Sequence, residues 1–544
     1  MTTSWESIAQ TAQHHRDATL AQINPPLPSI DTLPLNSTPV PRTVLTDSEL
    51  HITESAPETL ISHLASGTLT STAVTSAFLR RAALAQLLTN CVTELLPPAA
   101  LARAAFLDNY FREHGKPIGP LHGLPVSVKE HIGMEGLTLD AGFVAWHDRV
   151  AEENAHILDV LWAAGAVFYV RTTQPQTLMH LETDNNLYGV TVNPFNRNLS
   201  AGGSSGGEGA LLGMRGSCLG IGTDIGGSIR SPAAANGIYG FRPTSYRLPV
   251  SGWSATMQGA EHIVPVIGPL STSLAGIALF TKTLIDAQPW RREPSLVPLP
   301  WNPHPQLATL PSGTKVLKIG LLLDDGVVRP HPPVLRALRS VAEKLAEVEG
   351  VQVVEWTPYR HEWAWTVISS LYFADGGREE RDAIDASGEP WRPLTTFILK
   401  ENGNVKALSV KEVWDWTWER EKYREYARKW GDVDVILCPA GPGVALPHNC
   451  ARYWSYTSQW NLLDYPAVVA PVTKVDPAID LAKPDYVPRN EQDEYNYQLY
   501  DEPQRYANAP VSVQLVGRRY EDEKVLEAMA YIEEKIGLPW AEFV

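Results

Sequence analysis

The most distinctive stretch of the chain runs from residue 199 to residue 231 and reads LSAGGSSGGEGALLGMRGSCLGIGTDIGGSIRS. Its serines are candidate nucleophiles, because a serine hydroxyl attacks a carbonyl once a base has removed its proton. Glycine and serine also dominate flexible linkers, but a linker needs no leucine or isoleucine between its glycines. Glycines that alternate with apolar residues indicate backbone packed closely against other backbone or a ligand. We therefore expect a reactive site here.

The base for such a hydroxyl does not come from a familiar motif. The sequence has no GxxxxGKS/T phosphate loop and no GxSxG elbow, and its fifteen histidines form no evident Ser-His-Asp arrangement. A lysine is the alternative: Lys129 follows the apolar run 124–128 in LHGLPVSVKEHIG. Most lysines are solvated surface charges. Burial at a strand end beside a Gly-rich loop would lower the pKa of this one and let it act as a base.

The segments GLPVSVKE, GGSSGGE and TDIGGSIRSP together resemble the amidase signature family. Lys129 and Ser204 are 75 positions apart (204 − 129), and Ser204 and Ser228 are 24 apart (228 − 204). Further matching stretches are TVNPFN at 191–196, NLLDYPAVVAPVT at 461–473 and PVSVQLVGRRYEDE at 510–523. The resemblance covers the chain from about residue 50 and is strongest to the fungal acetamidase or general amidase branch.

The resemblance implies a Ser-Ser-Lys triad that hydrolyses a carboxamide to a carboxylic acid and ammonia or an amine. Ser228 would be the nucleophile and would carry the acyl group. Ser204, which follows a cis peptide in this family, would bridge Ser228 to the base, and neutral Lys129 would be that base. The oxyanion hole would be built from the backbone N–H groups of Ile225, Gly226, Gly227 and Ser228.

Residues beside the triad have supporting roles in this interpretation. Asp224 and Arg230 flank the nucleophile, and a structural ion pair that shapes the loop is favoured over direct catalysis. Ser205 is expected to be a supporting hydrogen-bond partner.

The substrate pocket is less well defined by the sequence. The segment QTLMHLETDNN, with Met179 and His180, is expected to border it. His180 could select the substrate or could be a structural histidine. Most of the 17 tryptophans belong to the core by base rate, and Trp253 and Trp460 are pocket candidates by their position in family-like segments.

The hydrophobic pattern predicts an α/β fold. Apolar runs at 124–128, 166–170, 316–323, 435–438, 467–472 and 511–516 indicate buried strands. A helical stretch at 333–348 between the runs 316–323 and 351–355 forms a βαβ pattern, which implies parallel pairing. Strands that are apolar throughout suit a sheet covered on both faces. We expect a large mixed β-sheet core with helices on both faces.

The N-terminal region differs in composition from the rest of the chain. Residues 1–50 are rich in Pro, Thr and Ser and are expected to form an arm with one short helix, and 51–544 a single catalytic domain. Ser55 and Glu58 have the spacing of a capping box, with Gly67 as a stop. A second helix is expected after Thr70 or Ser71.

The composition argues against several partners. A net charge of −16 disfavours nucleic acid and anionic membranes. The four cysteines form no CxxC pair, so no metal is expected, and no cofactor is implied. The N-terminus lacks a secretory h-region and no run of about 18 apolar residues occurs, so the cytoplasm is expected. The resemblance makes a homodimer an open option.

Four functions stay open at this level. The first is an amidase for small aliphatic or aryl-acetic amides. The second has the same chemistry on a larger acyl amide, a carbamate or a biosynthetic amide. The third is the amidase subunit of an aminoacyl-tRNA amidotransferase, and the acidic charge and N-terminal arm argue against it. The fourth is a non-catalytic relative, against which the presence of all three triad residues argues.

Overall fold

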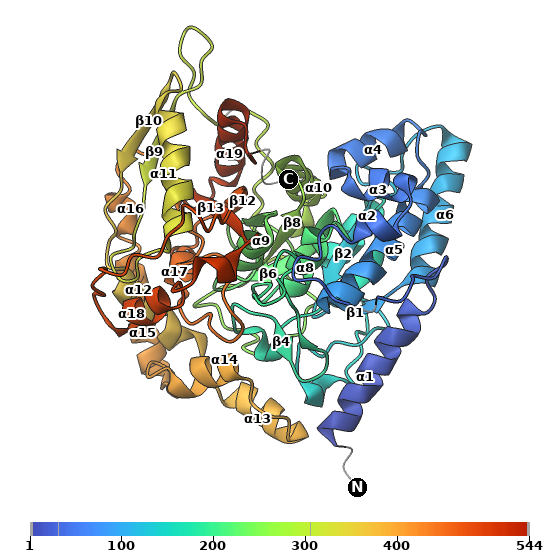
Figure 1. Cartoon of the computed structure of the whole chain (residues 1–544), viewed down its shortest axis with the longest axis horizontal. Coiled ribbons are helices and arrows are strands. Elements are labelled where there is room, and N and C mark those ends of the chain that lie inside the picture. The colour runs from blue at the N-terminus through green and yellow to red at the C-terminus, as the bar shows by residue number, and fades with distance from the viewer. Residues whose placement is uncertain (1–3, 31, 305, 541–544) are drawn as a thin grey trace.

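A large mixed sheet organises the chain. The computed structural model describes residues 4–30, 32–304 and 306–540 (Figure 1). In this part of the chain eleven strands form one sheet, in the spatial order β1 (Val92–Leu95), β3 (Val167–Thr172), β2 (Pro125–Lys129), β6 (Leu219–Asp224), β8 (Val266–Ser271), β7 (Tyr239–Arg242), β12 (Ala467–Lys474), β13 (Pro510–Val516), β11 (Val435–Cys438), β9 (Leu317–Leu321) and β10 (Val351–Glu355). A separate pair is β4 (Asp184–Asn185) and β5 (Gly189–Val190).

The sheet has a parallel section on each side of an antiparallel middle, and the edge strand β1 pairs antiparallel with β3. Strands β3, β2 and β6 run parallel, as do β11, β9 and β10, and the pairs between them are antiparallel. All residues of β2 and β13 are buried, as the apolar runs 124–128 and 511–516 predicted. Strand β6 is buried as well, although no apolar run indicated it. Helices cover both faces of the sheet, which confirms the predicted fold class.

The helices vary widely in length. The α-helices are α1 (Trp5–Leu20), α2 (Pro41–Val44), α3 (Asp47–Glu54), α4 (Pro57–Ala65), α5 (Ser71–Thr89), α6 (Pro97–His114), α7 (His156–Ala163), α8 (Gly206–Gly213), α9 (Arg230–Asn236), α10 (Leu274–Asp286), α11 (Pro332–Ala346), α12 (His361–Tyr372), α13 (Arg378–Ser387), α14 (Pro393–Thr396), α15 (Val410–Tyr423), α16 (Tyr426–Lys429), α17 (Ser455–Leu463), α18 (Glu491–Gln498) and α19 (Asp522–Ile536). Short 3₁₀ or π turns lie at Val144–Trp146, Gln176–Leu178, Pro289–Arg291, Phe397–Glu401 and Pro503–Tyr506.

The predicted βαβ unit is present. Strand β9, helix α11 and strand β10 follow one another, and β9 pairs with β10 in parallel. The second predicted helix is α5, whose N-cap is Thr70. The predicted capping box is wrong, because α4 begins at Pro57 after an Ala56 cap, and the Ser55 hydroxyl donates to the carbonyl of His51 in the preceding helix. The Ala56 side chain has no oxygen that could accept a hydrogen bond from the first-turn N–H groups.

The N-terminal region begins with a helix of 16 residues, α1, which packs against β1 at the edge of the sheet (Figure 1). The expected division at residue 50 falls inside α3, and the separation of an arm from a catalytic domain stays a prediction. Within the described residues, no helix is both long enough and apolar enough to cross a membrane.

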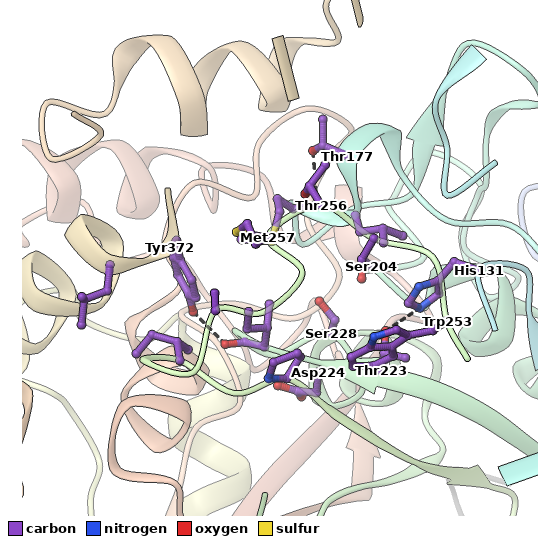
Figure 2. Close-up of a pocket in the computed structure, with 18 of the residues that line it drawn as sticks. His131, Thr177, Ser204, Thr223, Asp224, Ser228, Trp253, Thr256, Met257 and Tyr372 are labelled. Atoms are coloured by element: carbon purple, nitrogen blue, oxygen red, sulfur yellow. Dashed lines mark hydrogen bonds between the residues drawn. The ribbon is translucent and has the colours of Figure 1, made fainter. Parts of the chain in front are cut away.

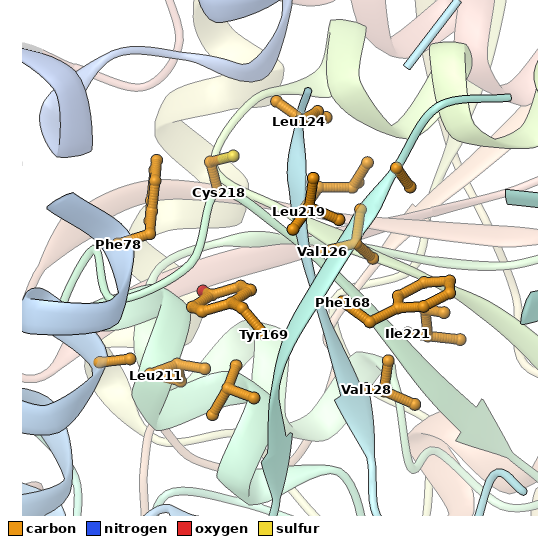
Figure 3. Close-up of a cluster of buried hydrophobic side chains, with 14 of the residues drawn as sticks. Phe78, Leu124, Val126, Val128, Phe168, Tyr169, Leu211, Cys218, Leu219 and Ile221 are labelled. Atoms are coloured by element: carbon orange, nitrogen blue, oxygen red, sulfur yellow. The ribbon is translucent and has the colours of Figure 1, made fainter. Parts of the chain in front are cut away.

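A hydrophobic cluster fixes the strands that carry the candidate site. Figure 3 shows Val126 and Val128 of β2 packed with Ile221 of β6 and Phe168 of β3. Val126, Val128 and Ile221 are fully buried. Because β2 ends at Lys129 and β6 ends at Asp224, this packing sets the positions from which both polar side chains emerge.

Candidate active site

Lys129 is a buried lysine with two hydroxyl partners. It is the last residue of β2, with no exposed surface. Its Nζ lies 2.7 Å from Ser204 Oγ and 3.0 Å from Thr223 Oγ1. Burial lowers its pKa from the usual 10.5 to about 7, and the nearby carboxylates of Asp224 and Glu208 limit that fall. The amine can therefore exist in its neutral form near neutral pH.

The two serines line the same pocket. Ser204 follows a cis peptide bond with Gly203, and Ser228 lies in the loop between β6 and α9. Figure 2 shows both side chains at the pocket. The backbone N–H of Ser205 donates to the carbonyl oxygen of Ser228 at 3.1 Å, which ties the two segments together. Among the described residues, no hydrogen bond joins the Ser204 and Ser228 hydroxyls directly.

The loop from Ile225 to Ser228 has fixed peptide planes. The Tyr372 hydroxyl donates to the Ile225 carbonyl at 2.8 Å, and the Thr457 hydroxyl donates to the Gly226 carbonyl at 2.7 Å. Gly227 has a φ of +133°, and a Cβ there would lie 2.3 Å from Thr457 Oγ1. Only glycine fits this position.

The four predicted amide donors are not equivalent. The Gly227 N–H donates to Asp224 Oδ1 at 2.9 Å, so it is already satisfied. Within the described part of the chain, the N–H groups of Ile225, Gly226 and Ser228 have no protein acceptor. The peptide planes of two of these N–H groups are held through their carbonyls, that of Gly226 by Tyr372 and that of Ser228 by the Ser231 N–H, which donates to the Gly227 carbonyl at 2.7 Å. Amides held in this way without an acceptor can stabilise a negative oxygen.

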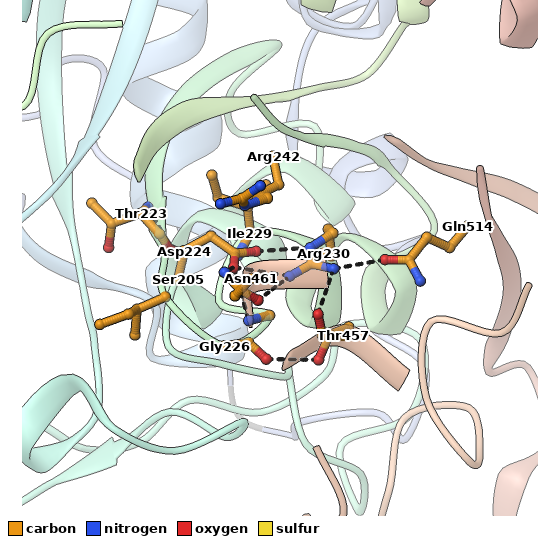
Figure 4. A network of polar contacts seen from close by, with 12 residues as sticks. Ser205, Thr223, Asp224, Gly226, Ile229, Arg230, Arg242, Thr457, Asn461 and Gln514 are labelled. Carbon is orange, nitrogen blue, oxygen red and sulfur yellow. Dashed lines mark hydrogen bonds and ion pairs between the residues drawn. The ribbon is translucent and has the colours of Figure 1, made fainter. Parts of the chain in front are cut away.

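Asp224 and Arg230 form a two-point ion pair that anchors this loop (Figure 4). Arg230 Nε and Nη2 each lie 3.0 Å from a carboxylate oxygen of Asp224. The other Arg230 contacts are the Thr457 carbonyl, Gln514 Oε1 and Asn461 Oδ1. Burial alone would raise the pKa of Asp224, but the charge and hydrogen bonds of Arg230 hold it at about 2. Asp224 is therefore an anion at any working pH.

The pocket above the serines is mostly apolar. Its walls include Met179, Trp253, Met257, Ile263 and Leu371, and the space left between them is about 60 Å³. One water needs roughly 10–15 Å³ of such space. The pocket therefore has room for a small group beside the serines without rearrangement. Of the four predicted pocket residues, the structure places Met179 and Trp253 in the lining.

The other two predicted pocket residues lie outside the lining. His180 Nε2 is 2.9 Å from Thr395 Oγ1, and burial lowers the pKa of this ring to about 3. Trp460 is almost completely buried, next to the rings of Tyr426 and Tyr465. Neither side chain is part of the pocket lining.

Comparisons with known proteins bear on this geometry. A family model described as Amidase matches residues 73–526. The chain belongs to the amidase family.

Relatives match this amidase over nearly its full length. A Schizosaccharomyces pombe protein provisionally named an amidase is 46% identical over 97% of this chain and 99% of its own. The acetamidase of Emericella nidulans is 42% identical over 99% of this chain and 98% of its own. A solved structure titled fatty acid amide hydrolase superposes with a TM-score of 0.92 at 35% identity, covering 98% of this chain and 95% of that chain. This amidase is therefore an enzyme that hydrolyses amides.

Some residues at the amidase site were not singled out from the sequence. Thr223 and His131 line the pocket and lie inside the quoted motifs TDIGGSIRSP and GLPVSVKEHIG, so their nearness to Ser228 and Lys129 was a usable signal. Tyr372 comes from α12, far along the chain, and no local pattern marks it. No group of three or more His, Cys, Asp or Glu in the described ranges is arranged to hold a metal ion.

Proposed function

We propose that this amidase forms an acyl-enzyme on Ser228, with Ser204 and Lys129 moving the proton. Neutral Lys129 takes a proton from the Ser204 hydroxyl while Ser204 takes the proton of Ser228. The Ser228 oxygen attacks the amide carbon, and the departing nitrogen receives a proton from Ser204. Water then hydrolyses the ester by the same relay to release the acid.

The contact between Lys129 and Ser204 carries this proposal. A distance of 2.7 Å allows direct proton transfer, and a lysine pKa of about 7 suits a general base at neutral pH. Both serines line one pocket, and the relay requires the Ser228 hydroxyl to come within hydrogen-bond distance of Ser204 Oγ.

The negative oxygen of the tetrahedral intermediate has three candidate donors. The N–H groups of Ile225, Gly226 and Ser228 are free to donate, whereas that of Gly227 is occupied by Asp224. The proposal therefore uses three of the four amides that the family resemblance implied. Asp224, Arg230 and Ser205 support the loop and do not react.

A small aliphatic or aryl-acetic amide is the substrate that the pocket favours. Its free space of about 60 Å³ suits a short acyl group, and Trp253 offers an apolar wall. The acetamidase relatives of Emericella nidulans and Aspergillus oryzae, each 42% identical, agree with this size. Ammonia release from acetamide, benzamide, indole-3-acetamide and a long-chain fatty amide tests the choice. A preference for the fatty amide would contradict it.

We also propose that the enzyme works in the cytoplasm, without a nucleic-acid or membrane partner. The net charge of −16 supports the absence of nucleic-acid and anionic-membrane partners.

The nucleophile is tested by replacing Ser228. Ser228→Ala should fold normally and lose about a thousandfold or more in kcat, because the hydroxyl that attacks the amide carbon is gone. A fluorophosphonate reagent should label Ser228 in the wild type, located by peptide mass. Ser312→Ala, at an exposed serine, is the matched control and should keep full activity. Near wild-type turnover in Ser228→Ala would overturn the assignment.

A further inference from the structure

A chain of polar contacts continues beyond Lys129, away from the serines. Thr223 Oγ1 lies 3.0 Å from Lys129 Nζ and also 3.0 Å from His131 Nε2. The other ring nitrogen, His131 Nδ1, lies 2.9 Å from the backbone carbonyl oxygen of Ser254. The mechanism above uses neither Thr223 nor His131, and both are buried.

The direction of each hydrogen bond in this chain follows from its far end. A carbonyl oxygen can only accept, so His131 Nδ1 must carry a hydrogen. Burial and the neighbouring Lys129 hold the pKa of His131 well below its usual value, so the ring is neutral and its Nε2 is an acceptor. The Thr223 hydroxyl must then donate to His131 Nε2. Its oxygen is left to accept from Lys129.

This direction matters for a neutral lysine. A neutral amine has one lone pair and two N–H groups. If the Thr223 hydroxyl pointed its hydrogen at Lys129, it would occupy the lone pair, and Lys129 could only donate to Ser204. With the Thr223 hydrogen held by His131, Lys129 donates to Thr223 and its lone pair is available for the Ser204 hydrogen. Only the second arrangement makes Lys129 a base.

We infer that His131 is a positioning residue, which acts through Thr223 to direct the lone pair of Lys129 toward Ser204. The inference rests on the proposed function, since it assigns how the proposed base is oriented. The chain of donors runs from Ser204 to Lys129, Thr223 and His131 and ends at the Ser254 carbonyl. Its last acceptor is a backbone atom, which cannot change its role with pH.

The His131 ring is held firmly in place. It stacks on Trp253 with a centroid distance of 5.7 Å and an angle of 20°. The backbone N–H of Ser254 donates to the His131 carbonyl at 2.8 Å, and Ile132 forms an antiparallel bridge with Trp253. Figure 2 shows the ring beside Trp253, with its bond to Thr223. The segment that forms a wall of the substrate pocket therefore also fixes the tautomer of His131.

The charged groups around this chain are few. Asp224 and Glu208 face Lys129, and Lys129 and Arg171 face His131. Loss of the Thr223 acceptor would remove a partner of the lysine cation. A free Thr223 hydroxyl would instead add a donor to the neutral amine. Each change lowers the pKa of Lys129 further, so the acid limb of the pH profile should move to lower pH.

Three variants test the inference. Thr223→Val keeps the shape but removes the hydroxyl, and His131→Phe keeps a ring against Trp253 but removes both nitrogens. Each should lower kcat about ten- to a hundredfold at the pH plateau with KM little changed, because a positioned base contributes roughly 10²–10⁴. Each should also move the acid limb of kcat/KM to lower pH. In His131→Gln the side-chain oxygen can accept the hydrogen bond from Thr223. This variant should therefore have most of the wild-type kcat and an acid limb close to the wild-type pH.

The outcomes separate this inference from the proposed function. The role of His131 would be overturned if Thr223→Val and His131→Phe both kept the wild-type kcat plateau and the wild-type acid limb of kcat/KM. If Ser228→Ala were inactive in the same experiment, the proposed triad would still stand. Activity in Ser228→Ala would instead overturn the proposed function itself. A ¹⁵N-histidine NMR spectrum gives a readout without turnover. The wild-type signal that is missing from the spectrum of His131→Gln belongs to His131. It should show the ring hydrogen on Nδ1, and a hydrogen on Nε2 would overturn the inference.

Discussion

At the scale of single residues, the site depends on the free-energy cost of burying one cation. Lys129 has no exposed surface, and its two direct partners are the uncharged hydroxyls of Ser204 and Thr223. Hydroxyls stabilise an ammonium less than water does, so burial favours the neutral amine. The carboxylates of Asp224 and Glu208 oppose this effect. The balance leaves the pKa near the pH at which a general base is most useful.

The first residue-scale prediction concerns the pH dependence. Because the base is the neutral amine, kcat/KM should rise with pH and reach half of its plateau near pH 7, the pKa of Lys129. Lys129→Ala should remove most of the activity and this rise. Lys129→Arg should not restore them, since a guanidinium stays charged at any usable pH. The measurement is kcat/KM from pH 5 to pH 10.

The control for this experiment is Lys411→Arg, at an exposed lysine that does not line the pocket. It should leave the profile unchanged. A wild-type profile in Lys129→Arg would show that Lys129 acts as a structural cation and that another group is the base.

At the scale of elements, the Asp224–Arg230 pair joins four pieces of the fold. Asp224 ends β6, Arg230 begins α9, Asn461 belongs to α17 and Gln514 to β13. Both charged side chains are fully buried. The nucleophile loop lies between the two members of the pair, so its shape depends on elements from the two halves of the sequence.

Removing the charge of Asp224 should be costly. In Asp224→Asn the amide nitrogen would face the donors of Arg230 and leave a buried cation without its anion. Breaking a buried pair in this way costs about 3–5 kcal/mol, and kcat should fall because the loop loses its anchor. Urea unfolding and kcat measure the two effects. Asp415→Asn, in the exposed pair with Lys411, is the matched control and should cost less than about 1 kcal/mol.

The same carboxylate gives a pH dependence of stability with a defined sign. The pKa of Asp224 is about 2 in the fold against the usual 3.8, so the anion stabilises the folded state above about pH 4. That contribution is lost as pH falls toward 2. In Asp224→Asn the free energy of unfolding should not show this part of the fall between about pH 4 and pH 2. An identical acid dependence in both proteins would contradict the ion-pair role.

Much of this element-scale picture was predictable from the sequence. The apolar runs gave strands such as β11 and β13 to within a residue, because a strand buried on both faces is apolar throughout. Motif order identified the triad segments. The pocket lining was harder to predict from the sequence, because Tyr372 and Leu371 reach the pocket from α12 by tertiary packing. The direction in which His180 points depends on Thr395, some 200 residues later.

At the scale of the whole molecule, the N-terminal helix is tied to the site by a chain of charges. His15 on α1 lies 2.9 Å from Glu94 on β1, and Glu94 lies 2.8 Å from Arg171 on β3. Arg171 donates in turn to the carbonyl of Glu130, the residue after Lys129. Helix α1 also packs Ala12 against Val144, Leu187 and Tyr188.

Deletion of residues 1–20 should therefore destabilise the enzyme without changing its chemistry. Strand β1 lies at the edge of the sheet, and the loss of α1 would uncover it and invite association between molecules. The apolar side chains of α1 would be lost from the core, at about 1–3 kcal/mol for each large one. The thermal midpoint should fall by several degrees. The kcat at low temperature should stay within about threefold of the wild type, because no residue of α1 lines the pocket.

Gln10→Ala, at an exposed position of the same helix, is the control and should leave both the midpoint and kcat unchanged. An unaltered midpoint in the deletion would mean that residues 1–20 are only loosely attached. A folded protein with abolished kcat would mean that the charge chain through Arg171 positions Lys129.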